Sequence, residues 1–163
     1  MNLEDDMDVR YINPFLIATQ HVFRTMLGLE PVMAKPMLKQ ERIASGEVTG
    51  VMGLSGDKRG AVAVSFTKKG ALFLYNTLMG DSANDIGPEV IDAIGELTNI
   101  ISGQARKELE RQGLNLKAAI PLVVTGKELE TSFITKLPII SLPFYFSVGN
   151  GEREVMYVDF SFE

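Results

Sequence analysis

The sequence predicts an α+β fold in which helices pack on one largely antiparallel sheet. Segments rich in strand-forming residues occur in consecutive blocks, and runs with helical periodicity separate these blocks, which is typical of the class. Inside the last block, Asn150-Gly151 indicates a tight hairpin turn, which joins antiparallel strands. The chain has 163 residues, of which 45% are hydrophobic and 23% charged. We therefore expect a single domain over residues 1–163 with one sizeable core.

Composition and charge narrow the classes of partner. The net charge is −5, and the Lys and Arg residues are scattered, so nucleic acid is not expected as a partner. The absence of cysteine excludes disulfides and thiolate chemistry. The N-terminal segment MNLEDDMDVR is acidic, unlike a signal peptide, and no apolar run approaches the ~18 residues of a spanning helix. We expect a cytoplasmic protein without membrane insertion.

The first helix is expected in the segment YINPFLIATQHVFRTMLGLE, which has helical periodicity. Asn13 is a suitable N-cap, because its side chain can accept a hydrogen bond from a free backbone N–H, and Pro14 suits the first turn. Gly28 is expected to end the helix, since glycine readily adopts the left-handed backbone of a C-terminal cap. The apolar stripe of this helix consists of Phe15, Ala18, Val22, Met26 and Leu29.

Three strands are expected next, over residues 32–40, 46–55 and 60–66, because turn residues divide this Val-rich and Met-rich region. The segment GLSGDKRG at 53–60 has the glycines and the lysine of a phosphate-binding loop. It lacks the ordered pattern of such a loop and lies between two strands rather than before a helix, so it predicts a hairpin turn.

Two helices follow these strands. Residues 68–79 predict a helix that ends at Gly80. Pro88 can open a long helix that extends to about residue 112, roughly 38 Å at ~1.5 Å per residue. This long helix carries the polar residues that point to a function.

The last strands are expected within residues 117–126 and 137–162. Between them, the short acidic segment ELE at 128–130 is interpreted as a solvated loop. The expected order is therefore a helix, three strands, two helices and a final block of strands, which favours an antiparallel sheet with helices packed on it.

His21 is the only histidine, and the sequence around it does not favour catalysis. A metal site would need further His or Cys ligands, and serine–histidine catalysis would need a nucleophile pattern that is absent. His21 is therefore interpreted as a structural residue of the first helix.

The long helix has two distinct faces at about 100° per residue. The apolar face, which is expected to pack on the sheet, consists of Ile91, Ile94, Leu97, Ile101, Ala105 and Leu109. The opposite face, whose members align because they are spaced by three, four or seven positions, consists of Asp92, Glu96, Asn99, Gly103 and Arg106. A face that is merely solvated is one interpretation of this pattern.

Glycine and asparagine on the helix favour a second interpretation. Gly95 and Gly103 each lower helix stability by about 1 kcal/mol relative to alanine, and Asn99 is a mediocre helix former. A solvated face would be expected to use Lys, Glu and Ala instead. We interpret this side of the helix as a docking surface that presents Glu96 and Asn99 to a partner. The predicted partner-binding residues are Asp92, Gly95, Gly103 and Arg106.

The order Asp92-x-x-x-Glu96-x-x-Asn99 resembles the motif of the CheC/CheX/FliY family of chemotaxis phosphatases. That motif has an Asp or Ser, a Glu and an Asn at this spacing, and a proline about twenty-two positions later, where this chain has Pro121. The resemblance extends to NPF in the first helix, to GEVTGVMGLSG and GAVAVSF, and to the final hairpin. The CheX branch is expected, because only one motif copy is present and none of the chain is left for the extra domain of FliY-type members.

The resemblance implies an activity and roles for these residues. Family members hydrolyse the phospho-aspartate of the response regulator CheY. By resemblance, Asn99 positions the attacking water, as a glutamine does in GTPases, and Glu96 pairs with a lysine of the regulator. Asp92 supports Glu96, contacts the partner or helps to solvate the helix, and Pro121 shapes its strand. No cofactor of its own is implied, because the phosphorylated regulator supplies Mg²⁺.

The family also implies a homodimer, for which the apolar final hairpin could provide an exposed edge strand. Two alternative functions would use the same helix face. The first is a non-catalytic CheX-like adaptor that binds a response regulator or a flagellar motor component. The second is a structural dimerisation domain whose helix face is merely solvated. Hydrolysis of a phosphorylated regulator would distinguish the phosphatase from both.

Overall fold

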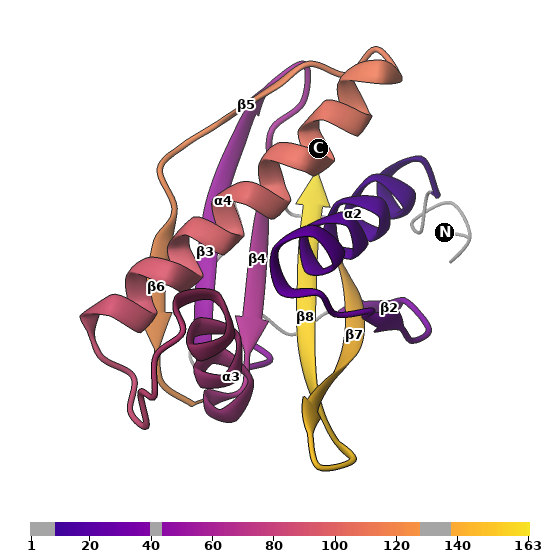
Figure 1. Cartoon of the computed structure of the whole chain (residues 1–163). Coiled ribbons are helices and arrows are strands. Elements are labelled where there is room, and N and C mark those ends of the chain that lie inside the picture. Colours follow the sequence, from indigo (N-terminus) through magenta and orange to yellow (C-terminus); the bar gives the residue numbers. More distant parts are fainter. Residues whose placement is uncertain (1–8, 40–43, 128–137) are drawn as a thin grey trace.

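In the described part of the chain, eight strands form one antiparallel sheet (Figure 1). The computed structural model describes residues 9–39, 44–127 and 138–163. The strands are β1 (Val32–Met33), β2 (Met37–Lys39), β3 (Val48–Gly56), β4 (Gly60–Phe66), β5 (Leu116–Ala118), β6 (Leu122–Thr125), β7 (Ile139–Gly149) and β8 (Glu152–Phe162). Their order is β1-β7-β8-β4-β3-β5, while β2 also pairs with β7 and β6 with β3.

The helices lie together on one face of this sheet (Figure 1). They are α2 (Val9–Val22), the π-helical segment η1 (Phe23–Leu27), α3 (Lys68–Met79) and α4 (Pro88–Arg111). The α+β architecture that the sequence predicts, with one long helix on a largely antiparallel sheet, is confirmed. No helix in the described ranges is both long enough and apolar enough to cross a membrane.

Local signals explain the bounds of α3 and α4, which match the prediction. The hydroxyl of Thr67 caps α3 by accepting a hydrogen bond from the backbone N–H of Gly70 at 2.9 Å. Gly80 ends α3 with a left-handed backbone at φ 62°. Pro88 occupies the start of α4. The N–H groups of the first turn have no partner within a helix, so the N–H that proline lacks is not needed there.

The start of α2 differs from the prediction. The helix is already formed at Val9, so Asn13 is not its N-cap and Pro14 lies inside it. Apolar contacts on both sides of the proline account for this. Tyr11 stacks on Phe162 of β8 with ring centroids 5.3 Å apart, and Pro14 itself is buried. Burial of these groups outweighs the backbone hydrogen bond that an internal proline removes.

The segment η1 ends at Gly28 as predicted, with φ 64°. A π-helical turn is wider than an α-helical one, so it moves the buried side of the helix by one residue along the sequence. As a result Leu27 is buried, whereas Met26, which the predicted stripe places in the core, is 41% exposed. The earlier members of the stripe are buried as predicted: Phe15, Ala18 and Val22.

The predicted strand 32–40 is present as two short strands, β1 and β2, on either side of Pro36. Proline has no N–H to donate to a ladder, so it interrupts the edge of the sheet. The strands predicted at 46–55 and 60–66 correspond to β3 and β4, and the segment between them is a hairpin turn as predicted. The segment 128–130 lies outside the described residues.

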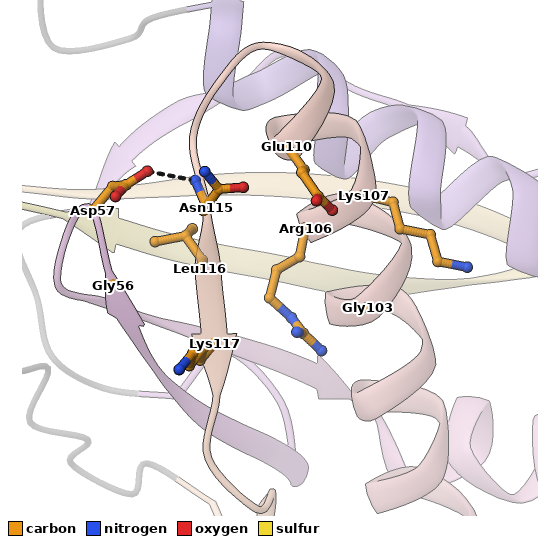
Figure 2. Close-up of a pocket in the computed structure, with 9 residues that line it drawn as sticks. All are labelled: Gly56, Asp57, Gly103, Arg106, Lys107, Glu110, Asn115, Leu116 and Lys117. Atoms are coloured by element: carbon orange, nitrogen blue, oxygen red, sulfur yellow. Dashed lines mark hydrogen bonds between the residues drawn. The ribbon is translucent and has the colours of Figure 1, made fainter.

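The core lies between the sheet and the helices. Alternate residues of four central strands face the helices and are buried, among them Val48, Met52, Val62, Val64, Leu142, Phe144, Val158 and Phe160. The long helix α4 packs on β3 and β4 through its apolar face. Toward its C-terminal end, α4 and β5 leave a cavity between them (Figure 2).

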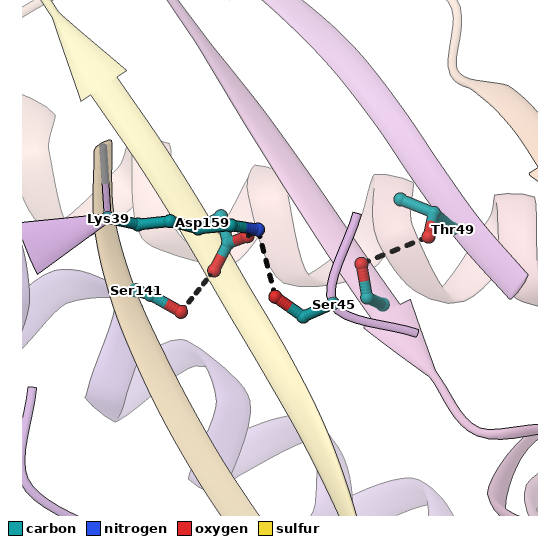
Figure 3. A network of polar contacts seen from close by, with 6 residues as sticks. Lys39, Ser45, Thr49, Ser141 and Asp159 are labelled. Atoms are coloured by element: carbon teal, nitrogen blue, oxygen red, sulfur yellow. Dashed lines mark hydrogen bonds and ion pairs between the residues drawn. The ribbon is translucent and has the colours of Figure 1, made fainter. Parts of the chain in front are cut away.

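The opposite face of the sheet carries a small polar network (Figure 3). The hydroxyls of Thr49 and Ser65 are 3.0 Å apart across β3 and β4. Ser141 Oγ donates a hydrogen bond of 2.5 Å to Asp159, and Lys39 Nζ lies 3.1 Å from the same carboxylate. Burial raises the pKa of Asp159, although Lys39 and Ser141 both act to lower it.

The final hairpin lies inside the sheet, which corrects one expectation. Asn150 and Gly151 form its turn with positive φ values of 54° and 73°, as the sequence predicts. However, β8 lies between β7 and β4, and β7 is covered by β1 and β2. Most of the hairpin is therefore paired on both sides, and only residues 146–149 and 152–155, next to its turn, have no outer strand partner in the described chain. The edges of the sheet are β1 with β2 on one side and β5 with β6 on the other.

Candidate functional site

The candidate site is built on α4, and a close helix–sheet contact fixes its position. Thr98 is fully buried and its hydroxyl donates a hydrogen bond of 2.8 Å to the carbonyl of Ile94. The same hydroxyl lies against Gly50 of β3, where a Cβ atom would come within 2.0 Å of it. Gly50 therefore allows α4 to approach β3 closely, one residue away from Asn99.

The apolar face of α4 is buried almost as predicted. Its fully buried members are Ile94, Leu97, Ile101, Ala105 and Leu109, while Ile91 is half-buried. The helix is thus held by its core face along most of its length, and its orientation about its axis is fixed. The predicted polar residues consequently take up defined positions on the other side.

Asp92, Glu96 and Asn99 lie together on the side of α4 that faces away from the core. Asp92 and Glu96 are exposed, and Asn99 is half-buried. None of the three side chains forms a hydrogen bond or an ion pair with another residue of the described ranges. Residues three apart on a helix have Cβ atoms about 5–6 Å apart, so the carboxylate of Glu96 and the amide of Asn99 can act on one ligand.

The link between β5 and β6 runs past this face. Val123 of β6 lies beside Gly95, while Lys117 of β5 lines the cavity next to Gly103. The chain between these two contacts therefore passes the level of Asn99, in the opposite direction to α4 (Figure 1). This link contains Pro121, which is half-buried.

An exposed apolar side chain lies in this link. Ile120 is 91% exposed, unlike most large apolar residues of the described chain. Leu122 is 64% exposed, but it lies opposite Val51 and next to Val123, whose side chain contacts Gly95, so it points to the face of the sheet away from α4. A carboxylate and an amide near an exposed apolar side chain form a surface suited to another protein. Ile120 was not among the predicted site residues, and its apolar character beside Pro121 was the only signal that could have identified it.

The two glycines of the predicted docking surface have different positions. Gly95 is buried, and a Cβ atom there would lie 3.3 Å from Val123 Cγ2. The missing side chain thus makes room for β6, so the placement of Gly95 on the docking surface is corrected. At Gly103 an added Cβ would contact only Arg106 Nη2, at 3.7 Å, so its outer side is open.

Arg106 extends from α4 toward β5 and lines the cavity with Gly103 (Figure 2). Its side chain is half-buried, and its Nε atom is buried without a hydrogen-bond partner in the described chain. It lies two turns after Asn99, which at ~1.5 Å per residue places it about 10 Å further along the helix.

The other candidates do not form a site. His21 is exposed on α2. Within the described ranges, no group of three or more His, Cys, Asp and Glu residues could hold a metal ion. The glycine-rich segment 53–60 joins β3 to β4 and has no helix after it. The face with Glu96 and Asn99 is therefore the arrangement that could take part in a reaction. An amide can orient a water molecule, and an exposed carboxylate can pair with a cation.

Comparison with known proteins gives consistent matches. The family model described as chemotaxis phosphatase CheX matches residues 48–145, which include Asp92, Glu96 and Asn99. The protein named CheY-P phosphatase CheX from Thermotoga maritima is 32% identical over 137 residues, which are 82% of this chain and 88% of that protein.

Solved structures with the same fold include two CheX proteins. The chemotaxis protein CheX from Desulfovibrio desulfuricans is 37% identical with a TM-score of 0.83, over 94% of this chain and 99% of that one. The CheX–CheY–BeF3–Mg²⁺ complex from Borrelia burgdorferi contains a chain that is 26% identical with a TM-score of 0.74, over 94% of this chain and 97% of that one.

Proposed function

The chain belongs to the CheX family of chemotaxis phosphatases, and from that premise we propose that it hydrolyses the aspartyl phosphate of a phosphorylated CheY-type response regulator. The T. maritima relative is named for this activity, and the B. burgdorferi relative forms a complex with CheY. The observation that carries the proposal is the polar face of α4, where the side chains of Glu96 and Asn99 lie adjacent and have no hydrogen-bond or ion-pair partner within the described chain.

Asn99 positions the attacking water in this proposal. Its amide has both a donor and an acceptor, so it can hold a water molecule in line with the phosphorus atom. The water oxygen forms a bond to phosphorus as the bond to the aspartyl oxygen breaks, which yields inorganic phosphate and a free carboxylate on the regulator. The half-buried position of Asn99 restricts its rotamers, which supports a positioning function.

Glu96 anchors the regulator. Its carboxylate is exposed and pairs with a lysine near the acyl phosphate, in a charge-assisted contact that sets the register of the complex. Asp92, one turn earlier on the same side, contacts the partner or supports Glu96. Ile120, in the link that passes this face, supplies apolar contact area to the docked regulator.

Mg²⁺ belongs to the regulator in this proposal. The relative from B. burgdorferi was solved with CheY, BeF3 and Mg²⁺ together. The described part of this chain has no cluster of three or more metal-ligating side chains. The reaction would take place in the cytoplasm, where a single domain spanning residues 1–163 would meet its regulator, and the family resemblance favours a homodimer.

The test is phosphate release from a phosphorylated CheY-type regulator in the presence of Mg²⁺. We expect the wild-type chain to accelerate release. Asn99→Ala should lose at least about a hundredfold of this acceleration while still binding the regulator, because only the water-positioning group is removed. Glu96→Ala should lose activity mainly through weaker binding, which a titration of the regulator would show.

Glu89→Ala is a matched control, because Glu89 is an exposed carboxylate on the same helix and lies outside the motif. It should retain near wild-type activity, and circular dichroism should show that every variant is folded. If wild type binds the regulator without accelerating hydrolysis, the protein is an adaptor and the proposal fails. If the Asn99→Ala variant stays fully active, another residue positions the water.

A further inference from the structure

Arg106 lies beside the face with Glu96 and Asn99, and the proposed hydrolysis gives it no role. It lies on the same side of α4 as these two residues, because the spacings of three, four and seven positions align on a helix. Its Nη2 atom is 3.7 Å from the position that a Cβ atom of Gly103 would take. Gly103 is one turn from Asn99, so the guanidinium group lies about 6 Å along the axis from Asn99 at ~1.5 Å per residue.

The guanidinium group of Arg106 has no partner within the described chain. Its side chain forms no hydrogen bond or ion pair there, and its Nε atom is buried from solvent. Glu110 is an exposed carboxylate one turn further along α4, but the guanidinium group points away from it, toward Gly103 (Figure 2). A buried donor without a partner costs stability, and native structures rarely leave one unexplained.

The other arginines of the described ranges all interact with another residue. Three form ion pairs with glutamates: Arg24 with Glu30, Arg59 with Glu163 and Arg111 with Glu108. Arg153 lies over the ring of Tyr145, 5.0 Å from its centre, and Arg10 also has an interaction partner. These arginines are exposed, whereas Arg106 is half-buried. Among the described arginines, the one most shielded from water is therefore the one without a partner.

The charges on this side of α4 change sign along the helix. Asp92 and Glu96 precede Asn99, whereas Arg106 follows it. The outer side of Gly103 is open, and the cavity of about 530 Å³ between α4 and β5 adjoins the guanidinium group (Figure 2). A group from another molecule can therefore reach Arg106. A complementary partner has a cation opposite Glu96 and an anion opposite Arg106.

We propose that Arg106 binds a carboxylate of the docked response regulator and thereby selects among regulators. This inference rests on the proposed function, because it assigns a second charged contact to the same complex. The planar fork of the guanidinium group can hold both oxygens of an aspartate or a glutamate. Gly103 is seven residues after Glu96, so the two contacts are about 10 Å apart along the helix and fix the orientation of the regulator. A regulator without an acid at this place leaves the buried Nε unpaired and binds less well.

Phosphate release at several concentrations of phosphorylated regulator, with Mg²⁺ and constant ionic strength, tests the proposal. Arg106→Met removes the charge and keeps most of the aliphatic side chain. We expect KM to rise about tenfold or more and kcat to change less than about twofold, because the lost contact lies away from the reacting atoms. Lys107→Met is the matched control. Lys107 is exposed and its amine points away from β5, so KM should stay within about twofold (Figure 2).

A charge exchange identifies the carboxylate on the regulator. Each exposed Asp or Glu of the regulator outside its phosphorylation site is replaced by Lys in turn and tested with wild type and with Arg106→Glu. We expect one regulator variant to bind wild type weakly and to bind Arg106→Glu at least about tenfold more tightly. A merely structural role of Arg106 cannot produce this rescue.

Urea unfolding shows whether the variants are folded. Arg106→Met should be at least as stable as wild type, because it removes a buried donor without a partner. If it does not fold, Arg106→Lys keeps the charge without the fork and should still raise KM. The proposal is overturned if Arg106 variants keep the wild-type KM, if kcat falls instead, or if Lys107→Met has the same effect. In these cases wild type still hydrolyses the regulator and the proposed function stands. A wild-type chain that neither binds nor hydrolyses the regulator would overturn both.

Discussion

Asn99 and Glu96 lie one turn apart on α4, yet their surroundings differ. Asn99 is half-buried beside the link between β5 and β6, whereas Glu96 is exposed. A side chain that must orient a water molecule benefits from restricted rotamers, and one that captures a partner's cation benefits from reach. The spacing alone predicts that these residues share a side of the helix, because helical periodicity is a local property. The burial of Gly95 could not be predicted, because it depends on Val123, far along the chain.

Asp159 gives a prediction about pH at the same scale. Burial raises its pKa in the folded state, while Lys39 and Ser141 oppose the shift. Its contribution to the free energy of unfolding is therefore fully present below the ordinary aspartate pKa of about 4 and is lost as the pH rises through the raised pKa. Asp159→Asn removes this titration. As the pH rises from about 4 to neutrality, we expect the free energy of unfolding of the variant to increase relative to that of wild type.

Urea unfolding at several pH values measures this difference. Asp92→Asn, at an exposed position, controls for the loss of one negative charge. A stability difference for Asp159→Asn that stays constant over this pH range would show that the carboxylate does not titrate there.

Among the elements, those with strong local signals could be predicted from the sequence. The caps at Thr67 and Gly80 and the proline at the start of α4 define two helices without tertiary information. The start of α2 could not be predicted, because the contact of Tyr11 with Phe162 joins the two ends of the chain. The π-helical phase shift at Leu27 is likewise decided by packing rather than by local propensity.

The contact between α4 and β3 gives a prediction at the scale of elements. In Gly50→Ala, the new Cβ would lie 2.0 Å from Thr98 Oγ1 and 2.8 Å from Thr98 Cβ, so the helix must move away from the sheet. We expect a loss of about 1–3 kcal/mol in the free energy of unfolding. Phosphatase activity should fall further than the folded fraction does, because Asn99 moves with the helix. Chemical denaturation and phosphate release measure the two effects.

Gly53→Ala provides the matched control on the same strand. Its added Cβ would meet only Ala119 Cβ at 3.9 Å, an ordinary contact. Stability and activity should therefore remain near those of wild type. Equal behaviour of the two alanine variants would show that the close approach at Gly50 does not position α4.

At the scale of the whole molecule, the order of the strands in the sheet could not be predicted from the sequence. Periodicity predicted a final hairpin, and β7 with β8 confirms it, but the pairing of β8 with β4 and of β7 with β1 and β2 joins distant segments. The prediction that this hairpin provides an exposed edge holds only for residues 146–149 and 152–155 next to its turn, because β1, β2 and β4 cover the rest. Edge positions follow from the full set of pairings, which local patterns do not contain.

The two true edges lead to a prediction about the expected homodimer. The edge with β5 and β6 borders the face with Glu96 and Asn99, where we propose that the regulator docks. We therefore expect subunits to pair through β1 and β2, where Val32 is 58% and Met37 is 48% exposed. A double variant, Val32→Lys with Met37→Lys, should be monomeric in sedimentation velocity, because lysine on an edge strand opposes pairing.

Leu122→Lys, on the opposite edge, is the control and should sediment as wild type does. A wild-type chain that is monomeric at every concentration would contradict the homodimer. A double variant that remains dimeric would place the interface elsewhere.

The buried face of α4 also determines how readily the proposed site can unfold locally. Asn99 follows directly after Thr98, and Leu97 and Ile101 on either side are buried in the core. The conformational entropy of these side chains is lost when the protein folds, so little remains to be lost when a regulator docks. Local opening of such a segment requires breaking the core, in contrast to a site on a mobile loop. The site is thus as resistant to local unfolding as the core on which it rests.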